Sequence, residues 1–204
     1  MRTAPNLVVF VRAPRLGAVK RRLAADIGAV AARRFYARTT AALLARVGRD
    51  SRWKTWLAVT PDRFAARGRF WPRDIERFPQ GDGDLGVRMA RAMARFAGEA
   101  VAIVGSDIPA LDANHISDGF AKLRGNDFVF GPASDGGYWL VGARDGVCAG
   151  DLFAAVRWST EHALVDTLAN LSGANASGRS FALLDELVDV DDGADLARIQ
   201  RRPR

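Results

Sequence analysis

The chain has few of the residues that build covalent or metal cross-links. Its 204 residues include one cysteine, Cys148, and two histidines, His115 and His162. One cysteine cannot form an intramolecular disulfide, which suits a reducing compartment. No histidine lies near Cys148 in the sequence, so a small buried apolar residue is favoured there over a nucleophile. Two histidines also exclude a zinc site built from several imidazoles.

Long apolar runs are missing as well. No segment approaches the roughly 20 apolar residues that span a bilayer. The first apolar run, Leu7–Val11, is short, and the basic residue Arg12 follows it instead of preceding it. This order is wrong for a signal peptide and favours a buried strand. The sequence therefore predicts a protein without a membrane partner, localised in the cytoplasm.

Lysine is scarce, although the chain carries a net charge of +7. Only Lys20, Lys54 and Lys122 are lysines, and the other basic residues are arginines. The first fifty residues hold eleven basic and two acidic side chains, whereas the remainder is nearly balanced. This asymmetry favours a phosphate-binding site or a nucleic-acid footprint. The alternative is a genome biased toward arginine codons. Aromatic residues are not interleaved with the basic ones, so we expect no nucleic-acid partner.

Apolar runs and helical periodicity alternate along the chain. We predict strands at 7–11, 53–59, 75–78, 101–104, 127–130, 138–141 and 181–190. We predict helices from about 19 into the forties with a break near Gly28, after 61, after Asp84, over 112–123, between 150 and 171 with Ser159 or Thr160 as a start, and over 192–200. Asp84 and Asp192 are expected to cap the helices that follow them. Such alternation is typical of an α/β protein with three α/β/α layers and a mostly parallel, twisted sheet. With no repeat or linker, residues 1–204 are expected to form a single domain.

In such sheets, ligands bind beyond the carboxyl ends of the strands. The first loop there lies within Val11–Leu23, which contains Pro14 and Gly17 and then the cations Lys20 and Arg22. Backbone N–H groups at a helix start, together with these cations, favour an anion such as phosphate. The spacing is not that of a Walker loop. A solvated basic loop is the alternative.

Three further loops carry carboxylates. Gly105–Pro109 places one acid at the end of an apolar strand, where it could hold Mg²⁺ or act only in a turn. Gly131–Trp139 combines an acid, two glycines and aromatic rings, which suits close ligand approach but equally a tight turn between strands. In Leu187–Leu196, Asp189 and Asp191 alternate, so that on an extended backbone they point to the same side and favour a metal unless both are simply exposed.

Taken together, these segments resemble a family of small bacterial glycosyltransferase-like proteins of GT-A fold (DUF2064). That family is related to nucleotidyltransferases that make molybdenum-cofactor dinucleotides and guanylylate phospholactate. The resemblance covers nearly the whole chain. It is carried by Phe10–Leu23, Gln80–Met89, Gly105–Leu111, Gly131–Tyr138 and Asp189–Asp192.

The resemblance implies a nucleotide-diphospho-sugar transferase fold and assigns roles to residues. Nucleotide phosphates would be held by Arg12, Ala13, Pro14, Gly17, Lys20 and Arg22. A divalent metal, Mg²⁺ or Mn²⁺, would be bound by Asp107, Asp189 and Asp191. The acceptor or sugar side would be formed by Asp84, Arg88, Gly136, Gly137 and Tyr138. Asp107 and Asp135 would be the catalytic residues, with Asp135 as the base. A homodimer is compatible with this picture.

Three positions depart from the family pattern. Arg12 stands where lysine is usual, and Arg21 stands where threonine is usual. The loop with Asp107 has one aspartate instead of the Asp-x-Asp of many sugar transferases. We therefore expect a metal-dependent transferase that uses a nucleotide-activated donor, foremost a nucleotide sugar, and a small-molecule acceptor. Nucleotidyl transfer from a nucleoside triphosphate to a small phosphorylated acceptor and non-catalytic nucleotide binding are the alternatives.

Overall fold

The computed structural model describes residues 4–67, 70–172 and 178–200. Strands and helices alternate along this part of the chain. Their order is β1 (Asn6–Arg12), α1 (Arg21–Ile27), α2 (Ala29–Val47), β2 (Lys54–Thr60), α3 (Arg63–Arg67), β3 (Glu76–Pro79), α4 (Leu85–Ala94), β4 (Val101–Val104), α5 (Ala113–Lys122), β5 (Phe128–Pro132), β6 (Tyr138–Ala143), α6 (Ala163–Ser172), β7 (Phe181–Leu183) and α7 (Gly193–Gln200).

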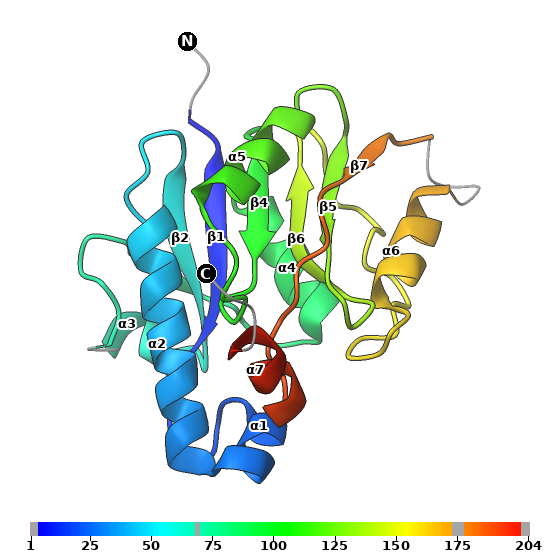
Figure 1. The fold of residues 1–204 in the computed structure, drawn as a ribbon. Helices are drawn as coiled ribbons and strands as arrows, with labels where there is room; N and C mark the ends of the chain where they lie inside the picture. The colour runs from blue at the N-terminus through cyan, green and yellow to red at the C-terminus, as the bar shows by residue number, and fades with distance from the viewer. Residues whose placement is uncertain (1–3, 68–69, 173–177, 201–204) are drawn as a thin grey trace.

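The described strands form one seven-stranded sheet in the order β3-β2-β1-β4-β6-β5-β7 (Figure 1). Only β6 runs antiparallel to its neighbours β4 and β5, and the other pairs are parallel. The predicted α/β architecture with a mostly parallel, mixed sheet is thereby confirmed.

Helices cover both faces of the sheet. The alternation of side chains along β1 sends Leu7 and Val9 to one face and Val8 to the other, and all three are fully buried. On the first face they pack with Leu43 of α2 and with residues of α3 and α5. On the second face the core includes Met89 of α4 together with residues of α6. These layers explain why β1 and β4 read as uninterrupted apolar runs, since strands buried on both faces need no polar alternation.

Aspartates begin three of the helices, two of them at predicted positions. The Asp84 carboxylate accepts the Val87 N–H at the start of α4 over 2.8 Å. Asp112 accepts two backbone N–H groups at the start of α5. The Asp192 carboxylate accepts the Asp195 N–H over 3.0 Å ahead of α7. Each bond satisfies a backbone donor that the first helical turn leaves without an intrahelical partner.

Three expectations were wrong. The strand predicted over 181–190 ends at Leu183. Two residues later, the carbonyl of Asp185 accepts the Trp139 indole N–H over 3.0 Å instead of a backbone N–H of a neighbouring strand. The helical sequence predicted after 150, with a start at Ser159 or Thr160, forms a helix only from Ala163, because Ala155 and Ser159 have positive φ values of 53° and 62° that a right-handed helix cannot contain. Cys148 is exposed and not buried.

The topology gathers all four sequence-derived loops at one edge of the sheet. β1, β4, β5 and β7 are parallel, so the segments that follow them leave from the same edge, and the turn between β5 and β6 lies there too. Among the described helices, none combines the length and the apolar character that a membrane span requires.

Candidate active site at the carboxyl edge of the sheet

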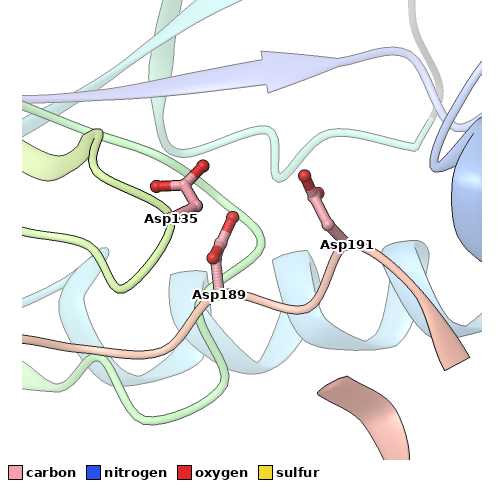
Figure 2. Close-up of side chains that lie close together, drawn as sticks. All are labelled: Asp135, Asp189 and Asp191. Atoms are coloured by element: carbon pink, nitrogen blue, oxygen red, sulfur yellow. The ribbon is translucent and has the colours of Figure 1, made fainter. Parts of the chain in front are cut away.

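Three carboxylates from two distant segments meet at this edge. Asp135 lies in the turn between β5 and β6, and Asp189 and Asp191 lie in the segment between β7 and α7. One carboxylate oxygen from each lies within 4.8 Å of the others (Figure 2). The carboxylates of Asp189 and Asp191, which the sequence predicts on one side of the chain, therefore lie close together, and that of Asp135 lies beside them. Clustered carboxylate oxygens are typical ligands of Mg²⁺ and Mn²⁺ in proteins.

Burial and charge repulsion in this cluster raise the pKa of Asp189. Burial and the negative charges of Asp135, Asp191 and Asp107 raise the pKa of Asp189 to about 6. A carboxylate whose charged form is penalised in this way gains most from a nearby cation. The residues present therefore fit a divalent metal by both their donor type and their electrostatics.

Lys20 supplies positive charge beside the cluster. Its Nζ lies 2.6 Å from Asp107 Oδ2 and 2.7 Å from Asp191 Oδ1, and its side chain is 6% exposed. Burial alone would lower the pKa of Lys20, but Asp107 and Asp191 outweigh it and the pKa is raised. Lys20 has a positive φ of 47°, which is uncommon for a residue other than glycine. Its backbone is therefore held in an unfavourable conformation while the ammonium joins two loops far apart in sequence.

Arg22 reinforces this contact from α1. Its guanidinium lies 2.5 Å from Asp191 Oδ2. Burial opposes the charged form of Asp191, yet Lys20 and Arg22 lower the pKa of this carboxyl below its usual value. Asp191 is thus ionised and paired, whereas within the described part of the chain no ion pair is found for neighbouring Asp189. Of the three metal ligands implied by the sequence, Asp107 is the one that lies outside the cluster of three carboxylates and contacts Lys20 instead.

Two cavities adjoin these side chains. The first, here called the basic cavity, has a volume of about 720 Å³, and it is lined by five basic and two acidic residues. These cations are Arg12, Lys20, Arg21, Arg22 and Arg88. The acids are Asp107 and Asp191, next to Lys20. Cavities of this size and charge suit a phosphorylated ligand such as a nucleotide.

The second, here called the acidic cavity, has a volume of about 590 Å³. Its carboxylates are Asp107, Asp135, Glu161, Asp189 and Asp191. Arg22 is its one cationic wall residue among those the structure describes, and apolar and aromatic side chains form much of the rest. Asp107, Asp191 and Arg22 line both cavities, so the two share one boundary.

Several predicted phosphate-binding positions lie outside the basic cavity. Ala13, Pro14 and Gly17 are absent from its walls. The Ala13 N–H already donates to the Thr60 carbonyl over 2.8 Å, and the Pro14 carbonyl accepts from Arg33 over 2.8 Å. This part of the loop is therefore committed to holding β1, β2 and α2 together, while the cations further along the loop face the cavity.

Of the residues predicted for the acceptor side, some line a cavity and others do not. Asp84 is absent from the walls of both cavities, and its carboxylate caps α4. Arg88 lines the basic cavity, where its guanidinium donates to the carbonyls of Gly83 and Asp84. Gly137 and Tyr138 line the acidic cavity. The Gly137 N–H donates to Asp135 Oδ1 over 2.9 Å and so orients that carboxylate.

Gly136 shapes the same turn without lining either cavity. Its φ is 81°, and a Cβ atom there would collide with the main chain of Glu161. Its carbonyl accepts the Leu164 N–H over 3.0 Å. The glycine therefore lets the segment before α6 pack directly against the turn that carries Asp135.

Sequence reasoning missed two groups of wall residues. Gln80 lines the basic cavity, and its side-chain amide donates to the carbonyls of Val11 and Ala58. It belongs to a motif that carried the family resemblance, which was its only sequence signal. Trp158–Glu161 lines the acidic cavity and has no motif. Its place depends on contacts with a turn more than twenty residues earlier.

Comparisons with known proteins show the family and the fold of this chain. The model of a family described as "Uncharacterized protein conserved in bacteria (DUF2064)" matches residues 43–160, which is more than half of the chain. No curated protein matches the sequence significantly.

Solved structures match over nearly the full length. A protein from Desulfovibrio desulfuricans G20, described as a "putative nucleotide-diphospho-sugar transferase", has a TM-score of 0.85 and 27% identity, covering 96% of this chain and 86% of its own. The 4-diphosphocytidyl-2C-methyl-D-erythritol synthase of Anaerococcus prevotii DSM 20548 has a TM-score of 0.61 and 9% identity, covering 97% of each chain. The manganese complex of Rv0371c from Mycobacterium tuberculosis H37Rv has a TM-score of 0.53 and 17% identity, covering 96% and 97%.

The two distant structures share the fold alone, whereas the first is similar in sequence as well. The nucleotide-diphospho-sugar transferase fold predicted from the sequence is confirmed. The first of these structures, which is similar in sequence, also supports an enzyme of the nucleotide-diphospho-sugar transferase kind.

Proposed function

The chain belongs to the bacterial DUF2064 family, and from this premise we propose that it is a metal-dependent glycosyltransferase that uses a nucleotide sugar as donor. The observation that carries this proposal is the shared boundary of a basic and an acidic cavity at Asp107 and Asp191. A nucleotide diphosphate suits the first cavity, and a divalent cation suits the carboxylates at the boundary. We further propose that the protein acts as one domain in the cytoplasm.

The proposed metal ligands are Asp107, Asp189 and Asp191, with Asp135 as a further carboxylate beside them. A bound Mg²⁺ or Mn²⁺ would neutralise the negative charge that develops on a departing diphosphate. The related fold of a protein solved with manganese is compatible with this choice of metal. Among the residues of this chain, the raised pKa of Asp189 supports the same assignment, because burial and the neighbouring carboxylates raise it and a cation would offset both effects.

Lys20 is proposed to bind phosphate from the basic side of the boundary. An ammonium has three N–H donors, and Asp107 and Asp191 use two of those of Lys20. The third is available to a phosphate oxygen without loss of either carboxylate contact. Arg22 and Arg88, which line the same cavity, would add forked donors for the remaining oxygens.

Asp135 is proposed as the base that accepts the proton of the acceptor hydroxyl. It lines the acidic cavity, and the Gly137 N–H holds one of its oxygens. The other oxygen is then free to accept a proton in a fixed orientation, as general-base catalysis requires.

Nucleotidyl transfer is the second candidate. It is favoured by the single aspartate in Gly105–Pro109, where many sugar transferases have Asp-x-Asp. The two reactions differ in their products, because only nucleotidyl transfer releases pyrophosphate. Incubation with labelled nucleoside triphosphates and nucleotide sugars, followed by analysis of the released phosphates, separates them.

The first experiment measures thermal stability with nucleoside triphosphates and nucleotide sugars, with and without Mn²⁺. At about 100 times Kd, a ligand stabilises by about 2.7 kcal/mol, which is roughly 5–10 °C for a protein of this size. We expect a metal-dependent shift with nucleotide sugars that Asp107→Asn removes. The matched control is Asp118→Asn, which changes an exposed carboxylate of α5. No shift with any nucleotide contradicts the proposed function. Binding without turnover of any donor and acceptor instead indicates a non-catalytic nucleotide-binding protein.

A further inference from the structure

The boundary between the two cavities limits where a second substrate can enter. If the diphosphate of a donor lies in the basic cavity, the reacting carbon lies near Asp107 and Asp191, which both cavities share. An attacking group must approach from the side opposite the leaving phosphate or from the flank of the metal. In either case the acidic cavity is the described space that adjoins this boundary.

The charge of the acidic cavity selects against anions. Five carboxylates line it, and its cations are Arg22 in the wall and Lys20 at the boundary, both already paired with Asp191. A divalent metal would bring this balance close to neutrality without making it positive. A phosphorylated or carboxylated acceptor would therefore meet Asp135, Asp189 and Glu161 without a free cation, which is unfavourable in a partly desolvated site.

The remaining walls are apolar and aromatic. Phe10, Leu85 and Met89 contribute from β1 and α4. The rings of Tyr138 and Trp158 lie edge to face with centroids 6.3 Å apart. The Tyr138 hydroxyl is inaccessible to solvent, so a ligand would meet the ring and not the polar group. Aromatic faces of this kind pack against the C–H faces of sugars and against apolar rings.

The segment Trp158–Glu161 in this wall is held in place by hydrogen bonds and packing. The Thr160 hydroxyl donates to the Arg157 carbonyl over 2.7 Å, and Arg157 forms a two-pronged ion pair with Asp166 of α6. The main chain of Glu161 packs against Gly136 so closely that no Cβ fits between them. Ser159, at a φ of 62°, lines both cavities. The main chain of this segment is therefore held in place, and Trp158 and Glu161 line the cavity that the acid cluster also lines.

We propose that the acidic cavity is the acceptor site and that its acceptor is an uncharged, hydroxyl-bearing compound with an apolar or aromatic face, not a phosphorylated one. This inference rests on the proposed transferase function and narrows it. Glu161 and Trp158 are the residues that select this class, Glu161 by repelling anions and Trp158 by packing against the apolar face.

The test uses matched probes that differ only in a phosphate group. They are glucose and glucose 6-phosphate, glycerol and glycerol 3-phosphate, and phenyl β-D-glucoside and its 6-phosphate. Binding is measured by saturation-transfer difference NMR with Mg²⁺ and an excess of inorganic pyrophosphate present, so that the phosphate-binding positions of the basic cavity are occupied and the probes report on the acidic cavity. We expect binding by the uncharged members, strongest for the phenyl glucoside, and at least about fivefold weaker binding by each phosphorylated partner, which corresponds to about 1 kcal/mol.

Variants assign the effect to the cavity. Trp158→Ala should abolish the extra affinity of the phenyl glucoside, whereas Phe70→Ala, at an exposed ring outside both cavities, should not change it. Glu161→Lys should raise the affinity of the phosphorylated probes about fivefold, because it replaces a negative by a positive charge. Glu161→Gln should have a smaller effect in the same direction. Glu161 is exposed, so these variants are expected to fold.

Three results would overturn the inference: tighter binding by the phosphorylated members, no binding by any uncharged probe, or a phenyl glucoside preference unchanged in Trp158→Ala. The nucleotide melting experiment on the same preparation separates this from the proposed function. If nucleotides stabilise the protein and phosphorylated probes bind best, only the acceptor class is wrong. If uncharged probes bind as expected and no nucleotide stabilises the protein, the donor assignment fails instead.

Discussion

The basic and acidic cavities share Asp107 and Asp191 but differ in how the chain builds them. The cations of the basic cavity come mainly from one stretch, Arg12 to Arg22, with Arg88 added from α4. The acidic cavity draws its carboxylates from the loop after β4, the turn after β5, the segment before α6 and the segment after β7. The difference shows that opposite charges can lie side by side when one set is local in sequence and the other is assembled by tertiary packing.

The contact that separates the two cavities is expected to give the largest effect. Lys20→Met leaves Asp107 and Asp191 without their shared ammonium, and breaking a buried ion pair costs about 3 kcal/mol. Urea denaturation without metal should show this loss. Lys54→Met removes an exposed pair with Glu76 and should change stability little. Mn²⁺ should restore part of the stability of Lys20→Met by replacing the lost charge, and equal losses in the two variants would contradict the assigned role.

The second-largest effect is expected from a substitution that fills the space between the turn that carries Asp135 and the segment before α6. Gly136→Ala adds a Cβ at a φ of 81° and against the main chain of Glu161, which should cost about 2 kcal/mol and weaken binding in the acidic cavity only. Gly146→Ala, at a φ of 75° with open space around it, is the control and should cost about 1 kcal/mol. Nucleotide binding in the basic cavity should survive in both. Identical destabilisation would show that the Glu161 contact is unimportant.

A smaller effect is expected from pH. The pKa of Asp189 is raised to about 6 in the folded protein, so its contribution to stability is present below pH 4 and is lost as the pH rises through 6. Asp189→Asn should therefore stabilise the metal-free protein by about 1 kcal/mol at pH 7.5, after allowance for solvent screening, and by almost nothing at pH 4. Thermal melts at both pH values, with Asp118→Asn as control, measure this. A stabilisation independent of pH would argue against repulsion within the cluster.

The smallest effect is expected within the basic cavity. Arg88→Met removes one of five cations there and should weaken nucleotide binding about threefold while leaving the uncharged probes unaffected. Arg73→Met, at an exposed arginine outside both cavities, should change neither. Titration calorimetry with the best-stabilising nucleotide provides the comparison. If Arg88→Met also alters binding of the uncharged probes, the two cavities are not independent.

Much of this fold could be predicted because its signals are local. The apolar runs of β1 and β4, the break at Gly28 and the cap at Asp84 all depend on neighbouring residues. The strand predicted through 190 ends at Leu183, and beyond it the Asp185 carbonyl accepts from Trp139, 46 residues away, before Leu187 pairs once more with Ala133. The site followed the same rule. Asp189 and Asp191 were recognisable as a pair by their alternation, whereas the closeness of Asp135 to them was not.

The sequence by itself determined the element order, the capping aspartates and the position of the carboxylates at strand ends, because each follows from backbone geometry within a few residues. Only the tertiary structure decided that Lys20 contacts Asp107 and Asp191. It also decided that Trp158–Glu161 lines the acidic cavity. Both depend on contacts between segments far apart in the chain, and burial and charge balance select such contacts only once the whole sheet is assembled.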